Sequence, residues 1–265
     1  MGEGAPPVLR VPAWDNIPGL LHGFCGRAGG TSLGAFKSLN LSCRVGDAAD
    51  AVRANWRVVQ RLLGASTRIA TLRQMHGSEI LTVGDEAGER GEADGLATDR
   101  PGVALGVLTA DCVPILLVAP QERVVAAVHA GWRGTLAGIV VAAVRHLERG
   151  FGVSPTQLQA ALGPAIGPCC YEVDCGIADA LESRWGRRPE AVRRGTHVAD
   201  KAMVDLRAVN AAQLSVAGVA RVTPLGPCTR CASAEYFSHR AVSGASGSGV
   251  TGRQLSFIGW KGTHD

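Results

Sequence analysis

The sequence lacks the features that mark membrane, exported and nucleic-acid-binding proteins. It has no apolar run of about 18 residues, and its first ten residues lack a basic segment followed by an apolar one. Aromatic residues make up only 5% of the chain, and Lys and Arg are scattered, with a mild net charge of +4. We therefore expect a cytosolic protein that binds no membrane and no nucleic acid.

The chain also lacks a low-complexity linker in its middle. A Gly/Ser-rich tract at 243–249 lies near the C-terminal end, where a loop is expected rather than a domain boundary. With 265 residues, 46% of them hydrophobic, the chain can bury a sizeable core. We expect one domain spanning residues 1–265. Its eight cysteines are expected to be reduced thiols, because no export signal accompanies them.

The most informative stretch runs from Thr109 to Thr135 and reads TADCVPILLVAPQERVVAAVHAGWRGT. Its apolar runs, 113–119 and 124–128, are separated by the polar turn signal PQER, which predicts an antiparallel pair of buried strands. Cys112 opens the first run and His129 closes the second. The thiol and the imidazole are therefore expected at the same end of neighbouring strands.

Hydrophobic spacing and capping residues predict the other elements. Helices are expected between Asp47 and Gly64, from 136 to 147 with Gly150 ending the run, after Asp174 as far as Trp185, and after Asp205 as far as about Gly218. Strands are expected on both sides of 74–77 and at 103–108, 158–162, 220–223 and 254–260, with loops at 23–45, 84–90 and 186–196. This order has no regular βαβ repeat, so it predicts an α+β fold with mixed sheets flanked by helices.

His76, Cys112 and His129 form a candidate metal site. Zinc prefers imidazole and thiolate ligands, and a catalytic zinc site has three protein ligands and an open fourth position. Spacing alone leaves two alternatives open: structural histidines beside an inert cysteine, or a Cys112 nucleophile with His129 as its base. The CxxC pair at 228–231 would suit half a structural zinc site, and the other close pair is 169–170.

Six motifs resemble, in the same order, those of the bacterial YfiH family, also called laccase-domain or polyphenol oxidase-like proteins. They are RQMHG at 73–77, ADGLAT at 93–98, TADCVPI at 109–115, HAGWRGT at 129–135, GPAIGPCCYEV at 163–173 and TGRQ at 251–254. The resemblance covers nearly the whole chain. It implies an α+β sandwich shared with a group of suspected cysteine hydrolases. It also implies a purine nucleoside phosphorylase of broad specificity, acting on adenosine, inosine and S-methyl-5'-thioadenosine, together with deamination of adenosine.

The resemblance also implies roles for particular residues. The metal, zinc or alternatively copper, would be held by the three motif residues His76, Cys112 and His129. Phosphorolysis needs an anion site beside the ribose, for which Arg27, Arg133 and the amides near Gly134 are the candidates. Many relatives have a His after the residue that corresponds to Arg27, whereas this chain has Ala28.

Deamination would need a carboxylate to move protons while a metal activates water. Asp111 or Asp94 could do this, and Asp111 could instead orient a metal-bound histidine. His239, in a tract that resembles the family's FFSHR segment, is a candidate for lining the substrate site, with a capping or packing role as the alternative. A mobile loop is expected at 241–250.

The expected partners are a purine nucleoside and phosphate, and a monomer is the favoured oligomeric state. Two other functions stay open. The first is a copper polyphenol oxidase (laccase), although such enzymes need paired HxH motifs and this chain has seven histidines and no HxH. The second is a cysteine hydrolase or an editing factor that acts on peptidoglycan precursors.

Overall fold

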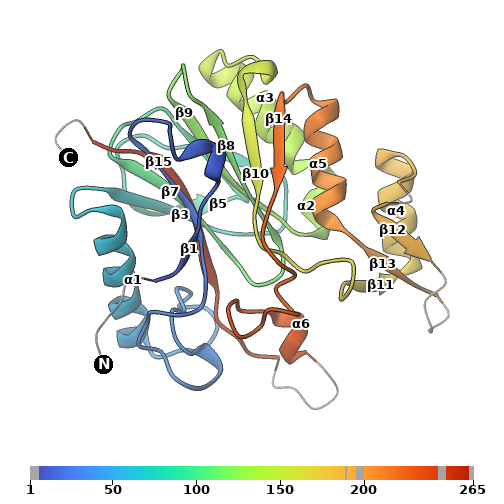
Figure 1. The fold of residues 1–265 in the computed structure, drawn as a ribbon, viewed down its shortest axis with the longest axis horizontal. Coiled ribbons are helices and arrows are strands. Elements are labelled where there is room, and N and C mark those ends of the chain that lie inside the picture. Colours follow the sequence, from blue (N-terminus) through green and yellow to red (C-terminus); the bar gives the residue numbers. More distant parts are fainter. Residues whose placement is uncertain (1–5, 189, 195–199, 244–248, 263–265) are drawn as a thin grey trace.

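The computed structural model describes residues 6–188, 190–194, 200–243 and 249–262. Within them, two six-stranded sheets form the centre of the molecule and a three-stranded sheet lies to one side (Figure 1). The first sheet has the order β1 (Val8–Leu9), β2 (Leu20–Cys25), β15 (Gln254–Trp260), β7 (Val103–Thr109), β3 (Arg68–Arg73) and β5 (Gly88–Glu92). The second has the order β14 (Arg221–Pro224), β10 (Gln159–Leu162), β8 (Val113–Ala119), β9 (Val124–Ala130), β6 (Gly95–Thr98) and β4 (Ile80–Thr82). The small sheet has the order β11 (Glu172–Asp174), β13 (Lys201–Val204) and β12 (Val192–Arg194).

Four helices cover the outer faces of the two large sheets: α1 (Ala49–Leu63) covers the first, and α2 (Trp132–Ala137), α3 (Ile139–Phe151) and α5 (Leu206–Val216) cover the second. Helix α4 (Cys175–Trp185) packs on α2 and on the small sheet, and α6 (His239–Val242) is a single turn. Short 3-10 turns lie at Pro12–Trp14, Gly34–Phe36 and Pro155–Gln157. Both large sheets are mixed, since β7 pairs parallel with β3 and antiparallel with β15, and β10 pairs parallel with β14 and antiparallel with β8. The α+β sandwich with flanking helices predicted from the sequence is thus confirmed.

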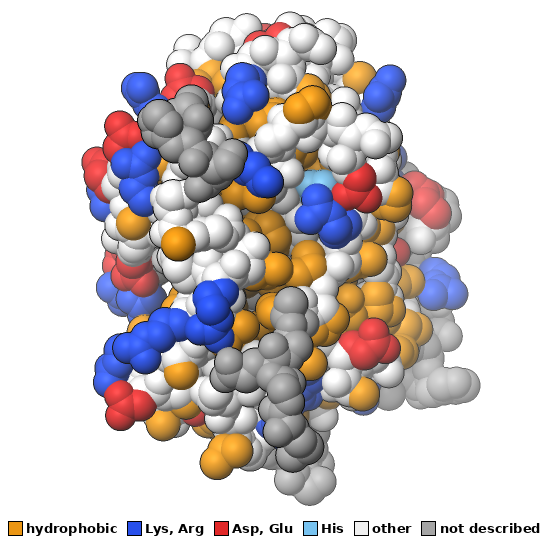
Figure 2. Space-filling model, turned by 60° about the vertical axis from the view of Figure 1, so that its left-hand side comes forward, with side chains coloured by type: hydrophobic (Ala, Val, Ile, Leu, Met, Phe, Trp, Pro, Cys, Tyr) orange, Lys and Arg blue, Asp and Glu red, His pale blue; other side chains and the backbone are white. Residues whose placement is uncertain are grey.

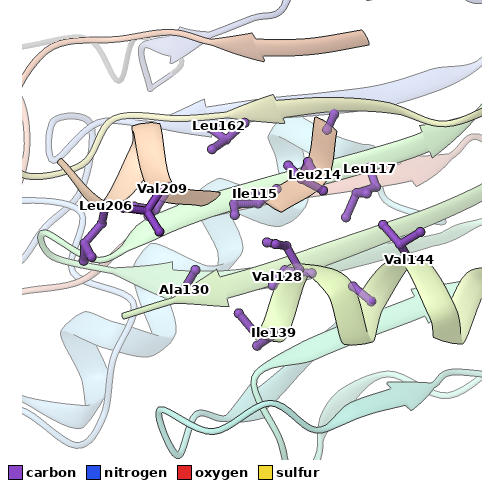
Figure 3. Packing of buried hydrophobic residues seen from close by; sticks show 14 of the residues in the cluster. Ile115, Leu117, Val128, Ala130, Ile139, Val144, Leu162, Leu206, Val209 and Leu214 are labelled. Carbon is purple, nitrogen blue, oxygen red and sulfur yellow. The ribbon is translucent and has the colours of Figure 1, made fainter. Parts of the chain in front are cut away.

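The core has three layers, and strand β8 contributes to two of them. Its Leu116 and Val118 pack between the two sheets with residues of β7 and β15. Its Ile115 and Leu117 face the other way, towards α3 and α5 (Figure 3). A third layer packs α1 against the outer face of the first sheet. Burial on both faces explains why β8 is a continuous apolar run rather than an alternating one.

The predicted strand pair of the central stretch is confirmed. Strands β8 and β9 pair antiparallel, with Pro114 opposite His129 and Val113 opposite Ala130. Cys112 therefore lies at the end of β8 that adjoins His129. Other elements also lie where predicted. They are the strands on both sides of the 74–77 turn, the strands at 103–109 and 254–260, and the helix capped by Asp205. The Asp205 side chain accepts hydrogen bonds from the amides of Arg207 and Ala208.

Several sequence predictions were wrong in detail. The helix expected at 136–147 is two helices, because Gly138 has a left-handed backbone (φ 82°) against which the Trp185 ring packs. The expected loops at 84–90 and 186–196 contain β5 and β12, whose side chains are largely exposed and polar. Ala48, not Asp47, is the N-cap of α1; Asp47 instead accepts hydrogen bonds from Ser32 and Asn40. Half of the mobile loop predicted at 241–250, residues 244–248, lies outside the described residues.

Lys and Arg side chains are dispersed among uncharged ones on the face seen in Figure 2, and hydrophobic side chains gather across its middle. Among the helices of the described ranges, none is long and apolar enough to cross a membrane.

Candidate metal and substrate site

The crossing between the two large sheets brings a thiol and two imidazoles together. Strand β7 of the first sheet ends at Thr109, and β8 of the second sheet starts at Val113, so residues 110–112 pass from one sheet to the other. Cys112 is on this crossing, His129 is on β9, and His76 is in the turn after β3. Their ligand atoms all lie within 4.8 Å of one another. The three residues predicted as metal ligands are therefore neighbours.

Asp94 holds both histidines in place. One of its oxygens, Oδ1, lies 2.8 Å from His129 Nδ1. Its carboxylate also accepts the three consecutive amides of Met75, His76 and Gly77, at 3.1, 2.9 and 2.6 Å. These bonds offset the cost of the left-handed conformation of His76 (φ 61°). With Nδ1 engaged, His129 presents Nε2 to the shared space, which is the arrangement usual for metal-bound histidines.

The residues of the cluster shift one another's ionisation. Burial opposes ionisation of the Cys112 thiol, but His129 and His76 outweigh it and lower its pKa from 9.0 to about 6. Burial also opposes a charge on His129, but the Cys112 thiolate and Asp94 raise its pKa from 6.5 to about 9. Burial would raise the pKa of Asp94, yet His129 and the amides around it hold that pKa below its usual 3.8. Near neutral pH the cluster therefore contains a thiolate, the form that binds a metal.

Gly131 leaves room for this cluster. A Cβ at this position would lie 2.9 Å from His76 Cδ2 and 3.2 Å from Cys112 Sγ. Gln74 fixes the other side of the turn, because its side-chain amide exchanges two hydrogen bonds of 2.8 Å with the backbone of Leu108. The turn that carries His76 is thus anchored to both large sheets.

A cavity of about 410 Å³ opens beside the cluster, within the range of small-molecule sites, about 300–1,000 Å³. Besides the three predicted ligands, its lining comprises Ser42, Arg44, Val45, Leu72, Gln74, Leu108, Thr109, Ala110, His239 and Arg253. His239, the candidate for lining the substrate site, is among these residues. An apolar cavity of about 580 Å³ adjoins it and shares Ser42, Arg44, Leu72 and Leu108.

Sequence reasoning missed the two arginines of this lining. Burial lowers the pKa of Arg253, and the negative charges of Cys112 and Asp111 act in the opposite direction. Arg44 is in the glycine-rich loop at 26–45, between β2 and α1, and pairs with Glu89 at 2.5 and 2.8 Å. The signal for Arg253 was present in the sequence, since this residue is in the TGRQ motif at 251–254.

The predicted phosphate ligands lie elsewhere. The guanidinium of Arg27 donates to the carbonyls of Lys37 and Ser233, at 2.8 and 2.7 Å, and stacks on Phe237. Arg133 is exposed on α2 and stacks on its neighbour Trp132. Gly134 is buried, and a Cβ there would lie 2.8 Å from the carbonyl oxygen of Gly77. None of the three is among the residues that line the cavity, within the described part of the chain.

The hydrogen bonds of Asp111 go to residues other than the two histidines. It accepts hydrogen bonds of 2.6 Å from the hydroxyl of Thr229 and from the amide of Arg240. The alternative in which Asp111 orients a metal-bound histidine is therefore wrong, because Asp94 occupies that position. The left-handed backbone of Asp111 (φ 94°) is the bend that turns Cys112 towards the cluster.

Comparisons with known proteins place the chain among one set of relatives. The family described as "Multi-copper polyphenol oxidoreductase laccase" matches residues 21–261. "Purine nucleoside phosphorylase YlmD" of Geobacillus stearothermophilus is 37% identical over 97% of this chain and 92% of its own length. "Adenosine deaminase RL5" of an unknown prokaryotic organism is 35% identical over 82% of this chain and 87% of its own length.

Solved structures of two similar proteins have the same fold as this chain. The crystal structure of YlmD from Geobacillus stearothermophilus has a TM-score of 0.84 and 36% identity, covering 98% of both chains. That of the Bacillus licheniformis hypothetical protein YfiH has a TM-score of 0.86 and 32% identity, covering 97% of both.

Proposed function

Because the chain belongs to the family described as multi-copper polyphenol oxidoreductase laccase, whose members include YfiH and YlmD, we propose that it is a zinc-dependent purine nucleoside phosphorylase. Its substrates would be adenosine, inosine and S-methyl-5'-thioadenosine. The observation that carries the proposal is the open two-histidine, one-cysteine donor set beside a cavity that two arginines line. Relatives named purine nucleoside phosphorylase support it.

The donor set fits a zinc-type ion. Two imidazoles and one thiolate are ligands that this ion prefers, and three protein ligands leave a position for water or substrate. The bond from Asp94 to His129 supplies the outer partner that metal-bound histidines usually have. When bound, such an ion would act as a Lewis acid on the substrate or lower the pKa of a bound water.

The charged lining of the cavity suits the phosphate. Cleavage of a glycosidic bond develops positive charge on the sugar, and an anion held beside the sugar stabilises that charge. Arg253 lies close enough to Cys112 for the negative charge of Cys112 to act on the pKa of the arginine. We assign Arg253 as the main phosphate ligand, with Arg44 at the cavity rim. Arg27 and Arg133 remain weaker candidates, since their guanidinium groups are held outside the cavity lining.

The remaining wall of the cavity suits the nucleoside. Leu72, Leu108 and Val45 offer an apolar surface for a purine ring, and His239 can donate a proton or a hydrogen bond to the departing base. Removal of the exocyclic amino group of adenosine is a second activity, favoured by the relative named adenosine deaminase. Asp111 remains a candidate proton carrier for that reaction, although its two oxygens are hydrogen-bonded.

The other functions have less support. Multicopper oxidases bind several copper ions, for which many histidines must cluster. Among the described histidines, His76 and His129 share a metal-ligand cluster, whereas His22, His146 and His239 do not. A cysteine hydrolase would use the same residues, with Cys112 as the thiolate nucleophile and His129 as its base. An editing factor for peptidoglycan precursors would have to bind a longer substrate across the two adjoining cavities.

Product analysis with adenosine separates these functions. The purified protein, loaded with zinc, is incubated with adenosine in the presence and in the absence of phosphate. We expect free adenine in the presence of phosphate only. Inosine in either buffer would assign the deaminase activity instead, and the absence of both products would refute a role in nucleoside chemistry.

Metal analysis of a single-residue variant tests the ligand set independently. Cys112→Ala removes the only thiolate of the site, so this variant should lose one equivalent of zinc per chain relative to the wild type. An unchanged zinc content would show that the proposed ligands are wrong. Cys25→Ala is a suitable comparison, because this buried thiol lies in the third core layer and should not change the zinc content.

A further inference from the structure

A second cluster of thiols lies outside the site described above. It consists of Cys169, Cys170, Cys228 and Cys231, whose sulfur atoms all lie within 4.8 Å of one another. Two loops contribute: 163–171 follows β10, and 225–238 follows β14. The cluster shares no ligand with the His76, Cys112 and His129 site. None of the roles proposed for the nucleoside site uses these four thiols.

The sulfur positions suit one tetrahedral ion. Cys231 Sγ lies 3.4 Å from Cys170 Sγ and 3.6 Å from Cys169 Sγ. A metal–sulfur distance of about 2.3 Å places two ligands of a tetrahedral ion about 3.8 Å apart, whereas a disulfide needs about 2.05 Å. The two distances to Cys231 are thus close to the spacing of ligands around a single ion and far longer than a disulfide bond.

Backbone hydrogen bonds organise the cluster as they do in cysteine-ligated metal sites. The amide of Gly167 donates to Cys228 Sγ at 3.2 Å, and the amides of Arg230 and Cys231 also donate to this sulfur. Cys170 closes a turn by donating its amide to the carbonyl of Gly167 at 3.0 Å. Hydrogen bonds of this kind orient a thiolate ligand and stabilise its charge. At Gly167 a Cβ would lie 3.2 Å from Cys228 Cβ, so glycine allows the loops this close approach.

We propose that these four cysteines bind one divalent cation of the zinc type in a closed, structural S₄ site. Four thiolates fill all tetrahedral positions and leave none for substrate, unlike the two-histidine, one-cysteine site. Binding a dication to four thiols releases four protons and leaves the centre with a net charge of −2. No electron transfer is involved, so the step needs no oxidant or reductant.

The ion would fix a wall of the nucleoside site. Thr229, between two of the ligands, is fully buried and donates to Asp111, the residue before Cys112. Its amide bonds to the carbonyl of Ala165 at 3.0 Å, which joins the two loops. The same segment continues to His239 in the cavity lining and to Arg240, whose amide also donates to Asp111. Metal bound by the four cysteines therefore ties both loops to the bend that presents Cys112.

Zinc content per chain, measured by elemental analysis of the full-length protein purified with a thiol reductant, tests the proposal. We expect two equivalents in the wild type, one in Cys231→Ser and one in Cys228→Ser. Cys43→Ser is the matched control, because Cys43 is an exposed cysteine outside both clusters, and it should keep two equivalents. A Cys231→Ser protein that still holds two equivalents would overturn the proposal.

Two further measurements keep the test valid if the cluster variants fail to fold. Cys112→Ser should retain one zinc, and X-ray absorption should show it surrounded by sulfur alone at about 2.3 Å. A zinc-free Cys112→Ser protein, or a shell that contains nitrogen, would contradict the S₄ site. Alkylation of the denatured wild type should modify all eight cysteines. A shortfall of two or four would reveal disulfides in place of metal.

Discussion

Asp94 couples the two histidines of the candidate site, because one carboxylate serves both. It is fully buried, and it contacts His129 through its side chain and His76 through the backbone. A buried carboxylate with this many donors has a strong preference for the charged form. The position and ring orientation of two proposed ligands therefore depend on one residue that binds no metal itself.

Substitution of Asp94 by Asn should weaken metal binding without removing a ligand. The amide group cannot accept all the hydrogen bonds that the carboxylate accepts, so the His76 turn and the His129 ring lose their fixed positions. We expect a 10–100-fold loss of zinc affinity at this site, measured by competition with a chromophoric chelator. Asp205→Asn is the control, because Asn also caps helices well, and it should leave the affinity unchanged.

Cys112 should be unusually reactive when no metal is bound. Its pKa of about 6, against 9.0 for an ordinary cysteine, means that the thiolate predominates above pH 6. In the metal-free protein, the rate of its alkylation by iodoacetamide should be nearly constant from pH 7 to 9 and fall tenfold per unit well below pH 6. Peptide mass spectrometry gives this rate for Cys112 separately. A rate that climbs steadily up to pH 9 would contradict the proposed thiolate.

The glycine-rich loop at 26–45 depends on one side chain of α1. Asn55 is fully buried and donates to Ser32 Oγ, to the carbonyl of Ser38 and to that of Asn40, and it accepts the amide of Thr31. Gly30 lies so close that a Cβ would be 2.5 Å from Asn55 Oδ1. Since Ser42 and Arg44 line the cavity, Asn55 also sets the position of one cavity wall.

Asn55→Ala should lower the free energy of unfolding by about 1–3 kcal/mol, because buried backbone groups of the loop lose their partners. Urea denaturation measures this change. The KM for the nucleoside should rise as well, because the loop moves. Gln60→Ala on the same helix removes hydrogen bonds to the carbonyls of Gly64 and Thr67, which lie outside the glycine-rich loop. This control should be destabilised with a smaller change in KM, and equal KM values for the two variants would count against the role given to the loop.

Elements with strong hydrophobic patterns could be predicted from the sequence, and exposed ones could not. The β8 and β9 strands were predictable because continuous apolar runs flank a polar turn. Strand β5 (GERGE) was missed because it is polar and largely exposed, and it is a strand only through parallel pairing with β3. The break at Gly138 was missed because the Trp185 ring that packs against this glycine comes from a distant helix.

At the scale of the molecule, the candidate site lies where the chain passes from one large sheet to the other. Neighbouring strands bring Cys112 and His129 together, so their proximity followed from the sequence pattern. The contribution of His76 depends on contacts between segments far apart in the sequence, so the residue types alone made it one candidate ligand among alternatives, and the family resemblance favoured it. The role of Asp94 and the contact of residues 169–170 with the CxxC pair depend on folded geometry in the same way.

The central claim is that the His76, Cys112 and His129 centre promotes cleavage of purine nucleosides by phosphate. Phosphorus NMR of the zinc-loaded protein with adenosine and phosphate tests it most directly, with wild type and His129→Ala compared at equal concentration. The account predicts that the wild type forms ribose 1-phosphate in equal amount to adenine, and that the variant's rate falls to background. A wild-type protein that forms no sugar phosphate, or a variant as active as the wild type, would contradict it.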